Sequence, residues 1–336
     1  MGNADNGYAS KSFSRFQNLL NTYQKRVEQQ YVGATYPEGT GLSGTFNPAN
    51  GTVDKYSSDV MIPAFLSAYT GGDRLDIFPS LLRMLPNWNV SYRGLSQLPW
   101  FKKHFRSVTL NHGYRSIYSV GSYNTYSTWM QYMGDLGFVA NTMTGSYLPS
   151  SMYDISSVSI NESFSPLIGV NVTLKNNMTL KAEYKKTRVM TLSMTSVQLN
   201  ESGSNDIVFG WGYRVSDFRP SKLFGRRRVK TKRKNDDKED GENTGKNVMN
   251  RELNLQFDFS YRSQSSITRD IQSSLSEITS GNKAIKASFS ADYTLSKYVT
   301  LSLYYDRQRN MPLLSSNAYP TITQDFGFSM RFSLTR

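Results

Sequence analysis

The last residues of the chain alternate strictly between apolar and polar side chains. In FGFSMRFSLTR, residues 326–336, one side carries apolar groups and the other carries glycine, serine, arginine and threonine. Successive side chains of a β-strand point to opposite faces of the sheet, so this period of two predicts a strand with one apolar and one polar face. The pattern raises the question of what the apolar face contacts: a protein core, a second sheet or lipid.

The same alternation recurs upstream, from about residue 86 onward. Apolar side chains are in phase over 88–92, 108–114, 168–172, 178–194, 207–215, 253–261, 285–293 and 299–305. Several segments between these runs are too short for a crossover connection, so neighbouring strands must be antiparallel. We predict an all-β fold of roughly nine long antiparallel strands, preceded by short helices.

The N-terminal part of the chain has a different period. Apolar residues recur every three or four positions over 11–32, which predicts an amphipathic helix. Residues 58–70 predict a short buried helix that ends at Gly71, and the Gly- and Pro-rich stretch 33–57 is typical of a loop. We therefore divide the chain into a helical and loop segment, 1–85, on the extracellular or lumenal side, and a strand segment, 86–336, with a basic loop at 219–249.

Composition favours a sheet with one polar, solvent-facing face and one apolar face. Hydrophobic residues are only 38% of the 336 residues and mean hydropathy is −0.51, yet there are 22 Tyr and 18 Phe. The alternation also exceeds the roughly five or six residues of sandwich strands and reaches the 9 to 11 or so that tilted membrane strands need. Both observations favour an antiparallel transmembrane β-barrel, whose apolar faces contact lipid and whose polar faces line the lumen.

Connection lengths follow the pattern of such barrels in part, since these have short periplasmic turns and long outer loops. If the last strand ends in the periplasm, the joints 175–177 and 295–298 are short and periplasmic. The outer joints would then be 122–152, 264–282 and 310–323, all long. The joints 200–206 and 218–250 break the rule. Tyrosines near strand ends resemble interfacial girdles: Tyr213, Tyr261, Tyr293, Tyr298, Tyr304 and Tyr305.

The alternation assigns individual side chains to the two faces. The predicted lipid-facing residues are Phe257, Phe259, Phe289, Leu301, Leu303, Phe326, Phe328, Met330, Phe332 and Leu334. The predicted lumen-facing residues are Lys181, Glu183, Lys185, Arg214, Lys286, Asp292, Asp306 and Arg331. In an outer-membrane barrel these two sets would face lipid and water, respectively.

Five segments carry a family resemblance: SDVMIPAFLSAYTGGD, LPNWNVSYRGLSQLPWFKKHFRSVTLNHGYRSIYSVGSY, SFSPLIGVNVTLKNNMTLKAEYKKTR, FGWGYRV and FGFSMRFSLTR. In this order they are similar to the C-terminal part of the SprA/Sov family. These proteins are the outer-membrane translocons of the Bacteroidetes type IX secretion system and are also needed for gliding motility. The resemblance covers about residues 56–336 and is specific because it extends over many segments.

The resemblance implies one very large outer-membrane barrel that conducts folded cargo. Its partners would be outer-membrane lipid, cargo with a C-terminal signal domain, a small PorV-like barrel over a lateral opening, and a periplasmic plug protein. Family members are several times longer than this chain. We therefore expect a C-terminal piece, from a fragment or a split gene, that joins the remaining N-terminal part of the barrel.

The sequence offers little for catalysis or cofactors. Its two histidines, His104 and His112, lack metal-ligand spacing, and there is no cysteine. Carboxylates such as Glu183 and Asp292 lie among polar strand positions and are interpreted as solvated charges. Gly210-Trp211-Gly212 lies within a strand without a following helix, so it indicates strand curvature or close packing rather than a phosphate loop. We predict a pore and scaffold that is not an enzyme and has no cofactor.

One charged run stands out, GRRRVKTKRKNDDKEDGEN, residues 225–243. Its basic residues are Arg226, Arg227, Arg228, Lys230, Lys232, Arg233 and Lys234. The run lacks aromatic residues for base stacking, so we predict a solvated loop and no nucleic-acid binding. A weak contact with an acidic partner or anionic headgroups is the alternative to a purely solvated loop.

Two other interpretations of the whole chain stay open at this point. The strands could form a small independent porin-like or transporter barrel, although nine is an awkward number for bacterial barrels, which are usually even. They could also form a soluble β-protein that binds glycans or partners at a surface. Solubility without detergent would favour the soluble protein over the pore.

Overall fold

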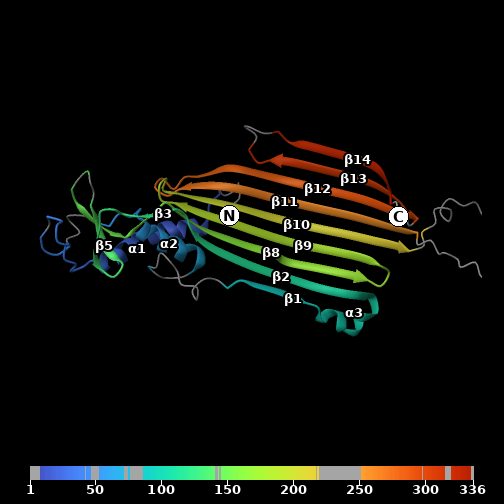
Figure 1. Cartoon of the computed structure of the whole chain (residues 1–336), viewed down its shortest axis with the longest axis horizontal. Coiled ribbons are helices and arrows are strands. Elements are labelled where there is room, and N and C mark those ends of the chain that lie inside the picture. The colour runs from blue at the N-terminus through green and yellow to red at the C-terminus, as the bar shows by residue number, and fades with distance from the viewer. Residues whose placement is uncertain are drawn as a thin grey trace, which may run out of the picture.

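One antiparallel sheet dominates the computed structural model of the chain (Figure 1). The structure describes residues 8–41, 43–46, 53–71, 75, 86–140, 143, 145–216, 218, 251–296, 298–314 and 319–333. Nine strands lie side by side in the order β1-β2-β8-β9-β10-β11-β12-β13-β14. Their bounds are β1 Trp88–Tyr92, β2 Phe105–Val120, β8 Ser157–Leu174, β9 Met178–Ser193, β10 Gln198–Ser216, β11 Glu252–Asp270, β12 Ser276–Ser296, β13 Val299–Pro312 and β14 Thr321–Phe332.

Two helices lie at one end of this sheet. Helix α1, Lys11–Gln30, buries one stripe of apolar side chains, and the hydroxyl of Ser10 caps it by accepting a 3.3 Å hydrogen bond from the Phe13 amide. Helix α2, Ser58–Thr70, is buried on nearly all sides and ends at Gly71, whose φ of 80° is the left-handed conformation that glycine adopts without strain. Among the described residues, no helix combines the length and apolarity required to cross a membrane.

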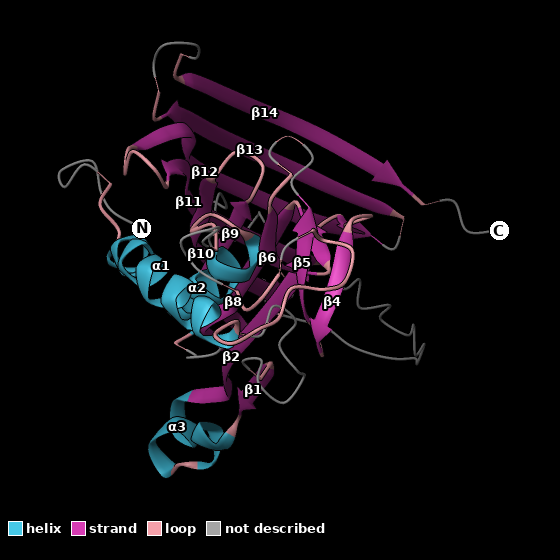
Figure 2. Cartoon of the chain, turned by 90° about the vertical axis from the view of Figure 1, so that its left-hand side faces the viewer, coloured by secondary structure: helices cyan, strands magenta, loops and turns pink. Residues whose placement is uncertain are grey.

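The connection between β2 and β8 folds into two small sheets beside the helices (Figure 2). One pairs β3, Tyr123–Thr125, with β7, Tyr153–Ile155; the other joins β4, Trp129–Met133, β5, Leu136–Ala140, and β6, Tyr147–Ser151. We call α1, α2, their flanking loops and β3–β7 the cap. The Tyr31 hydroxyl donates a 3.1 Å hydrogen bond to the Gly137 carbonyl and so ties the end of α1 to β5.

The buried core lies between the cap and the near ends of the long strands. From the cap it includes side chains of α1 and α2 and Phe138 of β5. From the long strands β8–β10 it includes Ile160, Met190, Leu192 and Leu199. The ladder between β9 and β10 continues without a bulge from this core to Met178, at the far end of β9. Alternation along the unbroken ladder therefore puts the cap on the same face of the sheet as Leu180 and Trp211.

The sheet is open. β1 and β14 are its two edges, and neither pairs on its outer side with another described strand. β1 has five residues and covers only 110–114 of β2, whereas β14 has twelve residues. The all-β antiparallel architecture predicted from the alternation is confirmed, and so are both helices.

Several predicted connections were wrong. Residues 200–206, expected as a joint, belong to β10, because the polar residues there pair with both β9 and β11 and the ladder overrides their turn preference. The true turn lies at 194–197. The joint expected at 264–282 shrinks to 271–275, and the stretch 122–152 contains strands. The contrast of short and long joints is thus lost as an argument for a barrel.

A short helical turn between β1 and β2 was also missed. It comprises η4, Gly94–Gln97, and α3, Pro99–His104, which begins with proline at its first turn. The Ser96 hydroxyl accepts a 2.8 Å hydrogen bond from the Val108 amide, where β1 no longer covers the edge of β2. This turn lies at the end of the sheet opposite the cap (Figure 1).

Candidate membrane-contact surface

A continuous band of apolar side chains crosses one face of the nine-stranded sheet. Strand register brings Val172, Leu180, Trp211, Phe257 and Phe289 into one row, each opposite the next. We call the band the apolar belt. It comprises the in-phase side chains of 88–92 on β1, Phe105 and 108–114 on β2, 168–172 on β8, 178–184 on β9, 207–215 on β10, 253–261 on β11, 285–293 on β12, 299–305 on β13 and 326–332 on β14.

The structure puts nearly all of the predicted lipid-facing residues in this belt. They are Phe257, Phe259, Phe289, Leu301, Leu303, Phe326, Phe328, Met330 and Phe332. Leu334 lies outside the described residues. That lipid is the contacting medium stays a prediction at this point.

Within the described part of the chain, the belt on β10–β14 is not covered by a second layer. None of its side chains joins the buried core, which is confined to the cap and the strand ends beneath it. Phe328 is 62% exposed and Phe209 on the interior strand β10 is 39% exposed. A soluble protein rarely leaves an apolar area of this size open, so the belt must be covered by something other than the described chain.

The belt runs obliquely across the hydrogen-bonded rows. We take the cap end of the strands as up. The uppermost belt residue on β13 is Tyr305, which lies on the same cross-strand row as Val108 of β2. On β2 the belt continues for six more residues toward the cap, to Tyr114. The lower edge shifts in the same direction, from Phe105 on β2 to Val299 on β13. The upper edge stays on one row from Ile168 of β8 to Ile285 of β12 and steps down at β13. Averaged from β2 to β13, with about 3.4 Å per residue and 4.8 Å per strand, the shifts of the two edges correspond to strand tilts of about 25–35°.

The belt also has the height of a bilayer core. On β11 it extends over 253–261, between Arg251 below and Ser263 above. This stretch is about 27 Å long along the strand, or roughly 24 Å along the normal after correction for tilt. The apolar band of outer-membrane barrels is about 25 Å tall, with strands tilted by about 35–45°.

The opposite face of the sheet is mainly polar. Register puts all the predicted lumen-facing residues on it: Lys181, Glu183, Lys185, Arg214, Lys286, Asp292, Asp306 and Arg331. Glu183 forms ion pairs with both Lys181 and Lys185, with Nζ–Oε distances of 3.1 Å, and Arg214 forms an ion pair with Glu252. The structure thus groups the two predicted sets on opposite faces. That the polar face lines a lumen stays a prediction.

Charges on this polar face require water. Asp306 lies directly opposite Asp325 on β14, and like charges that face each other across two strands repel. Repulsion between exposed charges is weak in water and strong in a medium of low dielectric constant. A dry partner surface is therefore a poor fit for this face, and an aqueous one is a good fit.

Glycines on the polar face make close packing possible. The Tyr304 ring lies over Gly327, so that a Cβ at residue 327 would come within 2.3 Å of the ring. Gly210 and Gly212 form the floor of a groove of about 680 Å³, bordered by Lys181, Asp258 and other polar side chains. The close packing predicted for Gly210-Trp211-Gly212 is seen, since Thr179 Oγ1 would lie 2.6 Å from a Cβ at residue 212.

The tyrosines divide between the faces. Tyr261 and Tyr305 close the upper end of the belt on β11 and β13, and Tyr213 and Tyr293 lie near its lower end. Tyr304, expected in the same girdle, instead lies on the polar face over Gly327. The alternation places it there because it is one residue out of phase with Tyr305.

A buried charge network joins the cap to the sheet above the belt. The Tyr69 hydroxyl of α2 donates a 2.5 Å hydrogen bond to one oxygen of Glu201, and Arg269 donates a 3.0 Å hydrogen bond to the other. Arg269 is fully buried, and its guanidinium lies 5.4 Å from the Phe13 ring of α1. Burial and the charge of Glu201 raise the pKa of Tyr69, which keeps its proton available for this hydrogen bond.

A second pair extends the network toward β2. Arg188 donates hydrogen bonds of 3.0 and 2.5 Å to one oxygen of Glu162, and the Tyr114 hydroxyl donates a 3.2 Å hydrogen bond to the other. None of these charged residues was singled out in the sequence. The pattern that could have found them is a charged residue in phase with apolar positions, such as Glu201 two residues after Leu199.

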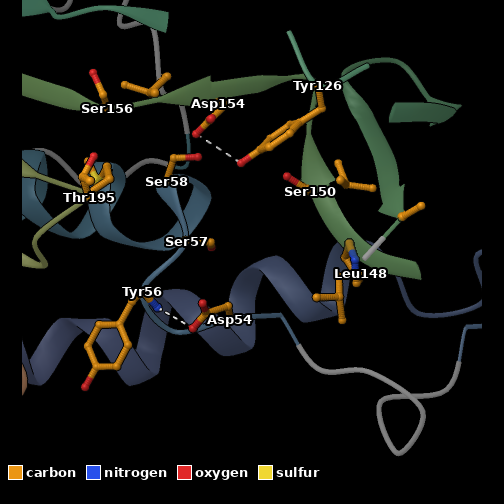
Figure 3. Close-up of a pocket in the computed structure, with 15 residues that line it drawn as sticks. Asp54, Tyr56, Ser57, Ser58, Tyr126, Leu148, Ser150, Asp154, Ser156 and Thr195 are labelled. Carbon is orange, nitrogen blue, oxygen red and sulfur yellow. Dashed lines mark hydrogen bonds between the residues drawn. The ribbon is translucent and has the colours of Figure 1, made fainter. Parts of the chain in front are cut away.

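The cap contains a pocket of about 440 Å³ (Figure 3). Its hydroxyls come from the start of α2, from β6 and from connecting segments, and the Tyr126 hydroxyl donates a 3.3 Å hydrogen bond to Asp154 of β7. Burial, followed by the charge of Asp154, raises the pKa of Tyr126 to about 12, so the phenol remains a donor at neutral pH. The buried Ser57 Oγ that borders it has no hydrogen-bond partner among the described residues.

His112 lies within the apolar belt on β2. Its Nδ1 lies 2.6 Å from the Leu167 carbonyl oxygen, and its ring centroid lies 6.1 Å from that of Trp88, so it acts in packing. In the described part of the chain, no group of three or more potential ligands could hold a metal ion. The predicted basic loop, with Arg226, Arg227, Arg228, Lys230, Lys232, Arg233 and Lys234, lies outside the described residues.

Comparison of the chain with protein-family models and with curated proteins gives no match.

Proposed function

We propose that this chain forms part of the wall of a large outer-membrane β-barrel, with the apolar belt against lipid and the polar face toward a water-filled lumen. The observation that carries the proposal is the oblique belt, uncovered by the described chain, roughly 24 Å tall. A soluble sandwich would cover such a face with a second sheet about 10 Å away.

The position of the cap supports a specific arrangement. The cap packs on the belt face and lies beyond the upper end of the belt. If that face contacts lipid, the cap lies outside the barrel wall, above the surface of the membrane, and does not fill the lumen. Of the extracellular and lumenal positions that the sequence left open for residues 1–85, this favours the extracellular one.

The open sheet supports a barrel larger than these nine strands. Exposed strand edges do not occur in the hydrocarbon region, so both β1 and β14 need pairing partners there. A small independent barrel would have to pair β1 with β14, but the five residues of β1 cannot match the twelve of β14. Strands from elsewhere in the barrel fit better than closure of this sheet on itself.

The specific role follows from the family resemblance of the sequence. We propose the C-terminal portion of the type IX secretion translocon, located in the outer membrane of a Bacteroidetes cell and also required for gliding motility. It would export folded cargo with C-terminal signal domains, together with a PorV-like small barrel and a periplasmic plug protein. Lumen-facing charges such as Lys286 and Asp292 would keep the conduit hydrated.

Site-directed spin labelling tests the two faces directly. The chain has no cysteine, so F289C and S288C each introduce one thiol, on adjacent residues that point to opposite faces. In outer membranes, a nitroxide at residue 289 should collide mainly with oxygen, which dissolves in lipid. A nitroxide at residue 288 should collide mainly with a water-soluble nickel chelate.

The outcomes separate the candidate functions. Equal accessibility to nickel at both positions would refute the lipid contact and favour the soluble surface-binding protein. For the secretion role, depletion of the chain should leave folded cargo with C-terminal signal domains in the periplasm. Normal cargo levels outside depleted cells would refute that role and leave the membrane barrel intact.

A further inference from the structure

Three cations cluster on the belt face just above the apolar belt. Arg307 and Arg309 follow Tyr305 in phase on β13, and Lys283 follows Ile285 in phase on the neighbouring strand β12. All three side chains are exposed, and none forms an ion pair within the described part of the chain. They lie on β12 and β13, next to the edge strand β14.

The cluster is compact enough to surround one anion. Arg307 and Arg309 are two residues apart on one strand, which separates them by about 7 Å. Lys283 lies opposite Met311 and diagonal to Arg309, a separation of about 7–8 Å. Flexible side chains of this length can converge on a single phosphate group, which arginine binds with paired hydrogen bonds.

The surroundings supply no counter-charge. The residues that face the three cations across strands are Gln324, Ile322, Ala287, Ile285, Met311 and Ser263. None is acidic, whereas cations elsewhere on the sheet, such as Arg188 and Arg214, have carboxylate partners. Three neighbouring like charges repel each other unless an anion lies between them.

We infer that Lys283, Arg307 and Arg309 form a binding site for the phosphate headgroup of a membrane lipid in the leaflet on the cap side. The inference rests on the proposed function, because it requires lipid against the belt. In that arrangement the acyl chains lie along the belt below Tyr305 and the headgroup reaches the cations. On β9, the exposed Lys186 lies on the same row as Lys283.

The test uses a local reporter in the intact protein. We would attach bimane to I285C, opposite Arg309, and reconstitute the chain together with the rest of its barrel in phosphatidylcholine nanodiscs. Quenching is then measured with nitroxide-labelled phosphatidic acid and, separately, with nitroxide-labelled phosphatidylcholine. The ratio of the two quenching efficiencies gives the local enrichment of the phosphate lipid.

We expect phosphatidic acid to be enriched in the wild-type background, and the enrichment to fall in R307Q/R309Q. Each cation near an anionic lipid contributes about fivefold, so the double variant should lose roughly 5- to 25-fold. The matched control is K286Q/R331Q, which removes the same charge from the opposite face. It should leave the ratio unchanged.

The outcomes also distinguish the two proposals. Equal quenching by both lipids, or enrichment unaffected by R307Q/R309Q, would overturn the headgroup site but leave the lipid contact. Complete competition by inorganic phosphate would show a site for a free anion and would also overturn it. Absence of quenching by either lipid would refute the membrane contact itself.

Discussion

A lysine in the middle of the apolar belt should be far more damaging than a lysine on the adjacent residue. Phe289 lies four residues from Ile285 and four from Tyr293, the two ends of the belt on β12. Each distance corresponds to roughly 12 Å of depth after correction for tilt. Phe289 therefore lies at the middle of the proposed bilayer core.

The magnitude follows from that depth. A lysine at the midplane of a membrane barrel costs about 2–4 kcal/mol, and the cost falls to about 0–1 kcal/mol near the interfaces. F289K should thus reduce the folding equilibrium roughly 30- to 900-fold, and I285K and Y293K should be mild. S288K should be neutral or slightly stabilising, because Ser288 lies between Asp258 and Asp306 on the polar face.

The assay is denaturant unfolding of the assembled barrel that contains this chain, in vesicles, followed by the shift of the folded band on unheated gels. Amounts in the outer-membrane fraction provide a check in cells. A flat response over residues 285, 289 and 293 would refute the depth profile. Equal tolerance of F289K and S288K would refute the assignment of the two faces.

Three further predictions concern the cap and the packing of the sheet. R269M leaves Glu201 buried without its ion-pair partner, so α1 and α2 should lose about 3–5 kcal/mol of protection in hydrogen exchange. The double variant E201Q/R269M should recover most of this protection. An unchanged exchange rate in R269M would contradict the role of the pair. Burial raises the pKa of Asp59, so cap stability should be greatest below the ordinary aspartate pKa and decline as pH rises through the raised value. D59N should abolish this dependence in a pH series of hydrogen exchange. A pH profile of D59N identical to that of the wild type would refute the prediction. G327V forces the Tyr304 ring from its place and should cost about 1–3 kcal/mol in denaturant unfolding; if Y304A fails to relieve the effect of G327V, the cause lies elsewhere.

The faces of the sheet were predictable because alternation is a local property. In 253–261 and 285–293 every second residue is apolar. Any register that pairs apolar positions of one strand with apolar positions of the other therefore puts the apolar side chains of both strands on the same face. The predicted belt and polar face therefore match the register over the described strands. The helices were predictable for the same reason, since a period of three to four is also local.

The strand ends were not predictable because they depend on neighbours. Residues 200–206 contain Asn, Ser and Gly, which favour turns in isolation, yet pairing on both sides holds them in β10. Likewise, the six residues of α3 are too few to show a helical period. The ion pair between Glu201 and Arg269 joins residues 68 positions apart, and only the register of β10 with β11 reveals that they meet.

The two edges of the sheet impose the strongest remaining condition on the proposed barrel. β14 carries exposed Phe326, Phe328 and Phe332 on the belt face, next to a backbone edge of twelve residues. In water such an edge would promote aggregation, and in lipid its unpaired amides and carbonyls would each cost several kcal/mol. β1 covers only part of β2, where the Asn87 side chain and Ser96 each accept a hydrogen bond from an amide that β1 leaves unpaired. The β2 edge is thus partly closed by the chain itself, whereas no described residue pairs with the outer edge of β14. If the belt meets lipid, β14 must pair along its length with a strand outside this sheet, because an unpaired backbone edge is not tolerated in the hydrocarbon region.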